Sequence, residues 1–167
     1  MNKVNMDQPF HPKTSIGHVH LKVSDLERAV QFYTEILGFA VTLRMGKSAA
    51  FLSAGGYHHH LGLNTWESAG GSPPSPGTTG LYHFAILMPD RKELAHTITR
   101  LADHNWPIDG AADHGVSESI YLRDPDSNGI EIYADRPRDQ WPSEADGKLI
   151  MYTRALDFDS VLGELKK

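Results

Sequence analysis

An internal repeat constrains this chain more than any other feature. HVHLKVSDLERAVQFYTEILGF starts at His18 and HFAILMPDRKELAHTITRLADH starts at His83, 65 positions later. In each copy a His opens an alternating apolar run, and an Asp follows seven residues on, at Asp25 and Asp90. Alternation is typical of a strand, and Asp is a common residue at the start of a helix. The repeat therefore predicts two similar modules, each opening with a strand and a helix.

Helical spacing and short β-like runs complete each module. In the first copy, Ser24 is a candidate N-cap with Glu27 three residues later, and Gly38 ends the helix. In the second copy, Asp90 is expected to cap a helix that stops before Pro107. Strands are expected at 39–44, 48–53 and 57–64 in the first copy, and near Ile108, at 119–123 and at 130–134 in the second. Each copy is thus a βαβββ unit, which predicts an α+β fold.

Length and composition favour a single domain with two flanking segments. The 167 residues suit one compact domain. We expect a flexible arm at 1–14 and one domain at 15–140, with module one at 15–66, a Gly-, Pro- and Ser-rich linker at 67–79 and module two at 80–135. Residues 141–167 are expected to form a tail with a short helix capped by Asp157, docked on the body or on a partner.

Charge and residue usage exclude several classes of function. The net charge of −5, without a basic cluster, argues against binding to nucleic acid or to an anionic membrane surface. The sequence has no apolar run long enough to cross a membrane and no leader-like segment, so we expect a cytoplasmic protein. Because the chain has no cysteine, any metal must be held by nitrogen and oxygen ligands.

Two histidines and one glutamate are placed as a set of metal ligands. His18 and His83 occupy the same position in the two copies, and Glu131 lies in the last expected strand. Side chains alternate across a strand, so His18 shares a face with His20 and Lys22, opposite the apolar face. A single His on a strand is more often a hydrogen-bonded core residue than a ligand. Two His at one offset together with a carboxylate instead match the facial triad of non-haem Fe(II) sites.

The repeat also resembles a known superfamily. HVHLKVSDLERAVQFYTEILGF, YHFAILMPD and DPDSNGIEIY are similar to the vicinal oxygen chelate superfamily, over residues 15–140. Its members include glyoxalase I, fosfomycin and bleomycin resistance proteins and type I extradiol catechol dioxygenases. The resemblance implies two βαβββ modules that form a curved mixed sheet around a metal site. Because this fold supports several reactions, the site residues must identify the function.

One segment is similar to the signature of the extradiol catechol dioxygenases. His114 is followed at the expected spacing by an apolar residue with Tyr121, by an Asp-Pro pair and by Glu131. The segment departs from the signature at Ala112 and Ser127, neither of which carries a group needed for the reaction. The resemblance implies that the metal ligands are His18, His83 and Glu131, with Fe(II) as the metal and Mn(II), Zn(II) or Ni(II) as alternatives.

The resemblance also implies roles for three residues around the metal. An acid–base His is expected where module one ends, and the run Tyr57–His60 offers His58 and His60 on one face of the expected strand. We prefer His60, and His58 stays open as the alternative. His114 is expected to hydrogen-bond a substrate oxygen, and Tyr121 to support the metal ligands. The alternative without a functional role is that His114 is a surface loop residue and Tyr121 a core residue.

The leading hypothesis is an extradiol ring-cleaving dioxygenase that acts on a catechol-type diol with dioxygen, as a homodimer. A glyoxalase-type isomerase would need a carboxylate base at the end of module one, where Asn64 stands. A fosfomycin-type thiol transferase would need an anion site rich in Lys, Arg and Ser, and no such site is located in this sequence. A metal-free drug-binding module would not explain why ligand-type residues occupy the matching positions. Many extradiol dioxygenases have four modules, and some relatives exchange modules between subunits. The chain is therefore either a complete small enzyme or half of a larger one, and its site is built either within one chain or between two copies.

Overall fold

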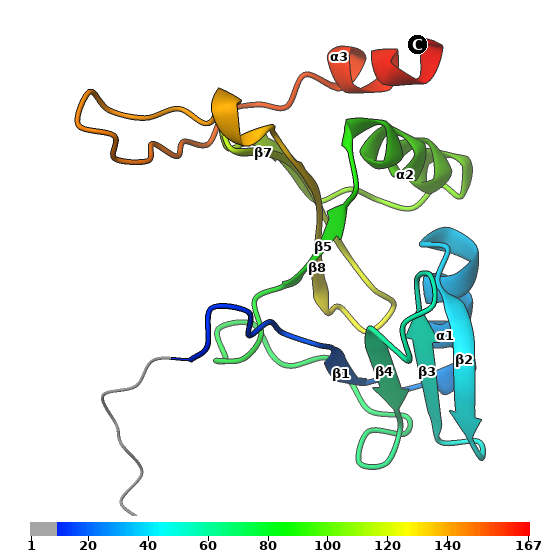
Figure 1. Ribbon diagram of the computed structural model, residues 1–167. Coiled ribbons are helices and arrows are strands. Elements are labelled where there is room, and N and C mark those ends of the chain that lie inside the picture. The colour runs from blue at the N-terminus through cyan, green and yellow to red at the C-terminus, as the bar shows by residue number, and fades with distance from the viewer. Residues whose placement is uncertain (1–9) are drawn as a thin grey trace, which may run out of the picture.

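The computed structural model describes residues 10–167, which form two βαβββ modules and a C-terminal tail (Figure 1). The first module contains β1 (Val19–Lys22), α1 (Leu26–Gln31) with a π-helical turn (Phe32–Ile36), β2 (Ala40–Met45), β3 (Ala49–Ser53) and β4 (Leu61–Asn64). The second contains β5 (Phe84–Met88), α2 (Arg91–Asp103), β6 (Gly110–Asp113), β7 (Ser117–Arg123) and β8 (Gly129–Asp135). A 3₁₀ turn (Arg138–Gln140) follows β8, and the tail contains α3 (Phe158–Leu162) and a second 3₁₀ turn (Gly163–Lys166). Part of the expected arm, residues 1–9, lies outside the described residues.

The two modules have the same strand order. The sheets run β1-β4-β3-β2 and β5-β8-β7-β6. In each sheet the first strand is parallel to the last strand of its module, and the other pairs are antiparallel. Helix α1 packs on β3 and β4, and α2 packs on β5 and β8. The α+β fold and the repeated module, both expected from the sequence, are confirmed.

Each helix begins at an Asp whose side chain accepts a backbone hydrogen bond. Asp90 accepts from the N–H of Glu93 at 2.9 Å, as expected. At α1 the cap is Asp25, which accepts from the N–H of Arg28, so the expected cap at Ser24 is wrong. The Ser24 hydroxyl instead donates to the carboxylate of Asp126 in module two. The first helix therefore starts one residue later than its sequence pattern indicates.

The last strand of module one is shorter than the run 57–64 expected from the sequence. Strand β4 begins at Leu61, which pairs with Leu52, and Tyr57–His60 belong to the loop between β3 and β4. Gly55 in this loop has a φ of 70°, a conformation that glycine adopts without strain. Strand alternation therefore does not decide which way His58 and His60 point.

Buried contacts hold the two modules in one relative orientation. The ring of Phe32 lies 4.6 Å from that of Trp106, between ring centroids. The buried Tyr33 hydroxyl donates to Asp124 at 3.0 Å, and Arg28 donates to Asp126 at 2.7 Å. Residues of both modules also share one hydrophobic core. Because these contacts are buried or paired, the modules are not free to swing on the linker.

Strands β1 and β5 are among those that keep one edge without a partner within residues 10–167. There, β1 pairs only with β4, and β5 pairs only with β8. An unpaired edge offers a row of backbone donors and acceptors to another strand. The expected ligands His18 and His83 directly precede these two strands.

The tail returns to module two and ends on α2, with α3 (red) beside α2 (green) in Figure 1. Asp157 caps α3 by accepting from the N–H of Ser160, as expected, and Val161 is fully buried. Among the described residues, no helix is both long enough and apolar enough to cross a membrane.

Candidate metal centre

His83 and Glu131 lie side by side at the start of the second sheet. Strands β5 and β8 are parallel, with Ala85 opposite Glu131. Gly129 allows this close approach, because a Cβ there would lie 2.2 Å from the Tyr82 carbonyl oxygen and 3.1 Å from the Cβ of His83. The Nε2 of His83 is 3.1 Å from Oε2 of Glu131. The sheet thus brings one nitrogen and one oxygen donor together, as the sequence predicts.

Tyr121 and His114 extend this pair into a hydrogen-bonded chain. Tyr121 on β7 is the register partner of Glu131, and its hydroxyl donates to Oε1 of Glu131 at 3.1 Å. The Nε2 of His114 lies 2.7 Å from the same hydroxyl. Burial, followed by the Glu131 carboxylate, raises the pKa of Tyr121. The tyrosine therefore stays protonated near neutral pH and is able to orient the carboxylate.

His18 is not part of this cluster within one chain. It is exposed, and its ring lies 4.5 Å from that of His59, between centroids. Within residues 10–167, no three His, Asp or Glu side chains gather closely enough to hold a metal ion. The donor types suit a divalent transition metal, but one chain brings together only two of the three expected ligands.

A pocket between the modules nevertheless joins His18 to the other candidates. Its volume is about 720 Å³, and His18, His60 and His83 all line it. The rest of its wall is largely apolar: Ile16, Val19, Phe39, Leu61, Leu81, Phe84, Ile86 and Leu87. Such a pocket suits an uncharged ring with a polar edge directed to the histidines.

His60 is the histidine of the 57–60 loop that faces this pocket. Its Nδ1 accepts from the N–H of Ala54 at 3.3 Å and lies 3.1 Å from the hydroxyl of Ser53. A neutral His60 therefore carries its proton on Nε2. His58 is exposed and does not line the pocket. These positions favour His60 over His58 as an acid–base group.

Two contacts near the site were not expected from the sequence. His59 lies against His18, and burial together with its histidine neighbours lowers the pKa of His59. The Nδ1 of His114 lies 2.9 Å from the backbone carbonyl oxygen of Tyr152 in the tail. The run of histidines hinted at the first contact. The second involves a backbone atom, which leaves no trace in the sequence.

Comparison with known proteins gives one consistent family. The model of the Glyoxalase/Bleomycin resistance protein/Dioxygenase superfamily matches residues 15–132. Catechol-2,3-dioxygenase of Bacillus subtilis is 46% identical over 155 residues, which cover 93% of this chain and 53% of the relative. Biphenyl-2,3-diol 1,2-dioxygenase 3 of Rhodococcus globerulus is 30% identical over 120 residues, which cover 72% of this chain and 63% of the relative.

A solved structure agrees on the fold. The glyoxalase/dioxygenase from Nostoc punctiforme superposes with a TM-score of 0.66 at 22% identity, covering 80% of this chain and 99% of that one. The chain spans about half the length of the Bacillus relative, with 53% covered.

Proposed function

The chain belongs to the glyoxalase/bleomycin resistance protein/dioxygenase superfamily, and on that premise we propose that it is an extradiol ring-cleaving dioxygenase acting on a catechol-type diol. One observation supports this proposal most strongly. Four side chains form a continuous chain of contacts, each within 3.1 Å of the next, in the order His83, Glu131, Tyr121 and His114. The chain begins with His83 at the wall of an apolar pocket. The names of the two similar dioxygenases, which refer to a catechol and to a biphenyl diol, support the same substrate class.

The ligands in this proposal are His18, His83 and Glu131, and the metal is Fe(II), with Mn(II), Zn(II) or Ni(II) as alternatives. Two His and one carboxylate leave open positions for small molecules. When bound, the metal supplies a redox-active centre that brings the diol and dioxygen together. Tyr121 keeps the Glu131 carboxylate oriented by its hydrogen bond.

The chain's own side chains have separate tasks toward the substrate. The apolar wall of the pocket holds the ring and excludes water. His60, whose Nδ1 is occupied by the Ala54 N–H, presents Nε2 to the pocket and exchanges a proton with a diol hydroxyl. His114, expected from the sequence to bind a substrate oxygen, has its Nδ1 beside the Tyr152 carbonyl and its Nε2 2.7 Å from the Tyr121 hydroxyl, so in this proposal it positions that hydroxyl.

The third ligand comes from a second copy in this proposal. The modules of one chain are held by the buried Tyr33–Asp124 hydrogen bond and the Phe32–Trp106 contact, so closing the pocket within one chain would break both. The unpaired edges of β1 and β5 support pairing between two copies, and dimers with two-fold symmetry are the commonest oligomers. A homodimer of this kind brings His18 of one copy toward the other copy's second sheet.

The test is oxygen uptake by full-length protein loaded with Fe(II) without air. Catechol and 3-methylcatechol are supplied in an oxygen electrode cell, and absorbance follows the yellow ring-cleaved product. We expect one oxygen consumed for each diol cleaved. Metal binding without oxygen uptake would contradict the dioxygenase and favour an isomerase or thiol transferase. Failure to bind any metal would favour a drug-binding module instead.

A further inference from the structure

The C-terminal tail makes direct contact with His114, which lies in the loop after β6. The Nδ1 of His114 is 2.9 Å from the carbonyl oxygen of Tyr152 and 3.4 Å from the hydroxyl of Thr153. A carbonyl oxygen only accepts hydrogen bonds, so Nδ1 must carry the proton. In a neutral ring the other nitrogen, Nε2, is then an acceptor, and it lies 2.7 Å from the Tyr121 hydroxyl. The single proton of that hydroxyl therefore lies between two acceptors, Nε2 of His114 and Oε1 of Glu131 at 3.1 Å.

Several contacts hold this part of the tail against the second sheet. The backbones of Asp113 and Arg154 exchange both hydrogen bonds, at 2.9 and 3.0 Å. The N–H of Tyr152 donates to the carbonyl of His114 at 3.3 Å. A Cβ on Gly115 would lie 2.7 Å from the Tyr152 ring, so only glycine fits beside the ring at this position. The guanidinium of Arg154 stacks on that ring, 4.0 Å from its centroid.

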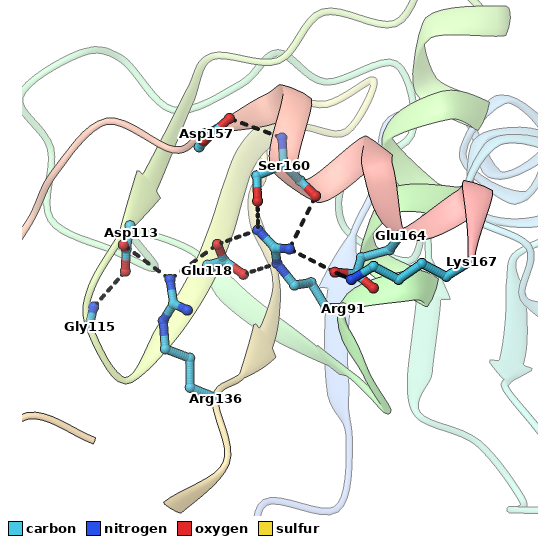
Figure 2. A network of polar contacts seen from close by, with 9 residues as sticks. All are labelled: Arg91, Asp113, Gly115, Glu118, Arg136, Asp157, Ser160, Glu164 and Lys167. Carbon is cyan, nitrogen blue, oxygen red and sulfur yellow. Dashed lines mark hydrogen bonds and ion pairs between the residues drawn. The ribbon is translucent and has the colours of Figure 1, made fainter. Parts of the chain in front are cut away.

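A charged network fastens the end of the tail, as Figure 2 shows. Arg91 on α2 donates to the buried carboxylate of Glu118 and also to Glu164 at 2.9 Å. The same guanidinium donates to the carbonyl of Ser160 at 3.1 Å. Val161, fully buried, adds an apolar contact on the α2 side. Helix α3 is therefore held by both charge and burial.

The network continues from the tail to the residue beside His114. Arg136 lies 3.1 Å from Glu118 and 3.1 Å from Asp113. Asp113 in turn accepts from the N–H of Gly115 at 2.8 Å, which shapes the His114 turn. The docking of α3 and the conformation of this turn thus depend on the same buried carboxylate, Glu118.

We propose that the C-terminal tail is a positioning part of the site, in which the Tyr152 carbonyl selects the tautomer of His114 that faces Tyr121 through Nε2. A His114 released from the tail exchanges its proton between both nitrogens and turns its ring freely. The Tyr121 hydroxyl then loses the fixed acceptor that, together with Glu131, sets the position of its proton. The effect of this tail contact on catalysis rests on the proposed function, whereas the tautomer of His114 does not.

The experiment reads the His114 ring directly in the full chain. The ring nitrogens of ¹⁵N-histidine-labelled protein are followed by two-bond ¹H–¹⁵N NMR, and His114→Asn assigns the signals. Val161→Asp places a charge in the buried contact with α2 and detaches α3. Phe158→Asp is the matched control, because it adds the same charge at an exposed position of the same helix. The pair Ser160→Ala and Glu164→Gln, made together, weakens the dock without a buried charge and serves if Val161→Asp does not fold.

We expect a protonated Nδ1 and a bare Nε2 on neutral His114 in the parent chain and in Phe158→Asp. In Val161→Asp both signals should move to averaged positions, and kcat should fall about tenfold or more with little change in KM. Unchanged His114 signals in a chain whose tail is detached, as judged by protease cleavage in 141–157, would overturn the inference. The NMR reading needs no turnover, so absence of oxygen uptake in the parent chain would overturn the proposed function alone.

Discussion

The side chains of His83 and Glu131 lie 3.1 Å apart, although one precedes β5 and the other lies in β8. Parallel pairing of the first and last strands of module two produces this proximity. The equivalent strands of module one are paired in the same way, but His18 there meets His59 rather than a carboxylate. The two modules therefore share an architecture and differ in chemistry, and module two carries most of the candidate metal centre.

Tyr121→Phe should lower activity about 10- to 100-fold, because Glu131 loses the hydroxyl that orients it. The measurement is kcat/KM for catechol together with iron affinity. Tyr133→Phe is the control, since Tyr133 lies on the pocket wall but outside the hydrogen-bonded chain. Equal losses in both variants would show that the chain from Tyr121 to Glu131 has no special role.

His60→Gln should reduce kcat about 100-fold or more, because the proton-exchanging Nε2 is removed from the pocket wall. His58→Gln, in the same loop but exposed, should change kcat by about threefold at most, since surface substitutions away from a site have small effects. Steady-state kinetics with catechol separate the two residues. The reverse order of effects would assign the acid–base role to His58.

A mixture of two inactive variants should regain activity if each site takes ligands from two copies. His18→Ala and Glu131→Ala are unfolded and refolded together. Each mixed dimer then contains one intact site and one doubly damaged site, so random pairing should restore about a quarter of the parent activity. Each variant refolded alone is the control. Activity that stays at the control level would place all three ligands in one chain.

Tyr33→Phe should reduce the loss of stability at alkaline pH. Burial, followed by the nearby Asp124, raises the pKa of Tyr33 well above its ordinary value. Above about pH 10 an unfolded chain releases this proton while the folded chain keeps it. The unfolded state then binds fewer protons, so the free energy of unfolding falls by up to about 1.4 kcal/mol per pH unit.

Urea denaturation between pH 8 and pH 11 measures this slope. Tyr33→Phe should also lose about 1–2 kcal/mol at pH 8, because buried Asp124 loses a donor. Tyr82→Phe is the control, since Tyr82 is 88% exposed. Parallel alkaline slopes in the parent chain and Tyr33→Phe would show that Tyr33 contributes no proton linkage.

Periodicity and repetition were enough to predict the modules, because strand alternation and helical spacing are local properties of the chain. The caps at Asp90 and Asp157 followed from the same local chemistry. The cap at α1 did not, because Ser24 is engaged by Asp126 from the other module. A contact between residues so far apart in the sequence can override a local capping pattern, and the local pattern does not reveal it.

The candidate site was predictable only in part, for a similar reason. The closeness of His83 and Glu131 follows from strand pairing within one module. The place of His18 depends on how two modules, or two copies, meet, and no local pattern encodes that. The loop position of His58 and His60 depends on where the β3–β4 pairing ends. The contact between His114 and the Tyr152 carbonyl could not be predicted, because every residue has a backbone carbonyl and the sequence does not mark this one.

Metal content tests the central claim most directly. The parent chain, Glu131→Gln and Glu27→Gln are loaded with Fe(II) without air, desalted and measured for iron by mass spectrometry. Glu27 is the control carboxylate, since its exposed side chain pairs with Arg44. We predict about one iron per chain in the parent and in Glu27→Gln, and a large loss in Glu131→Gln. Equal iron in all three, or none in the parent chain, would contradict the proposed metal centre.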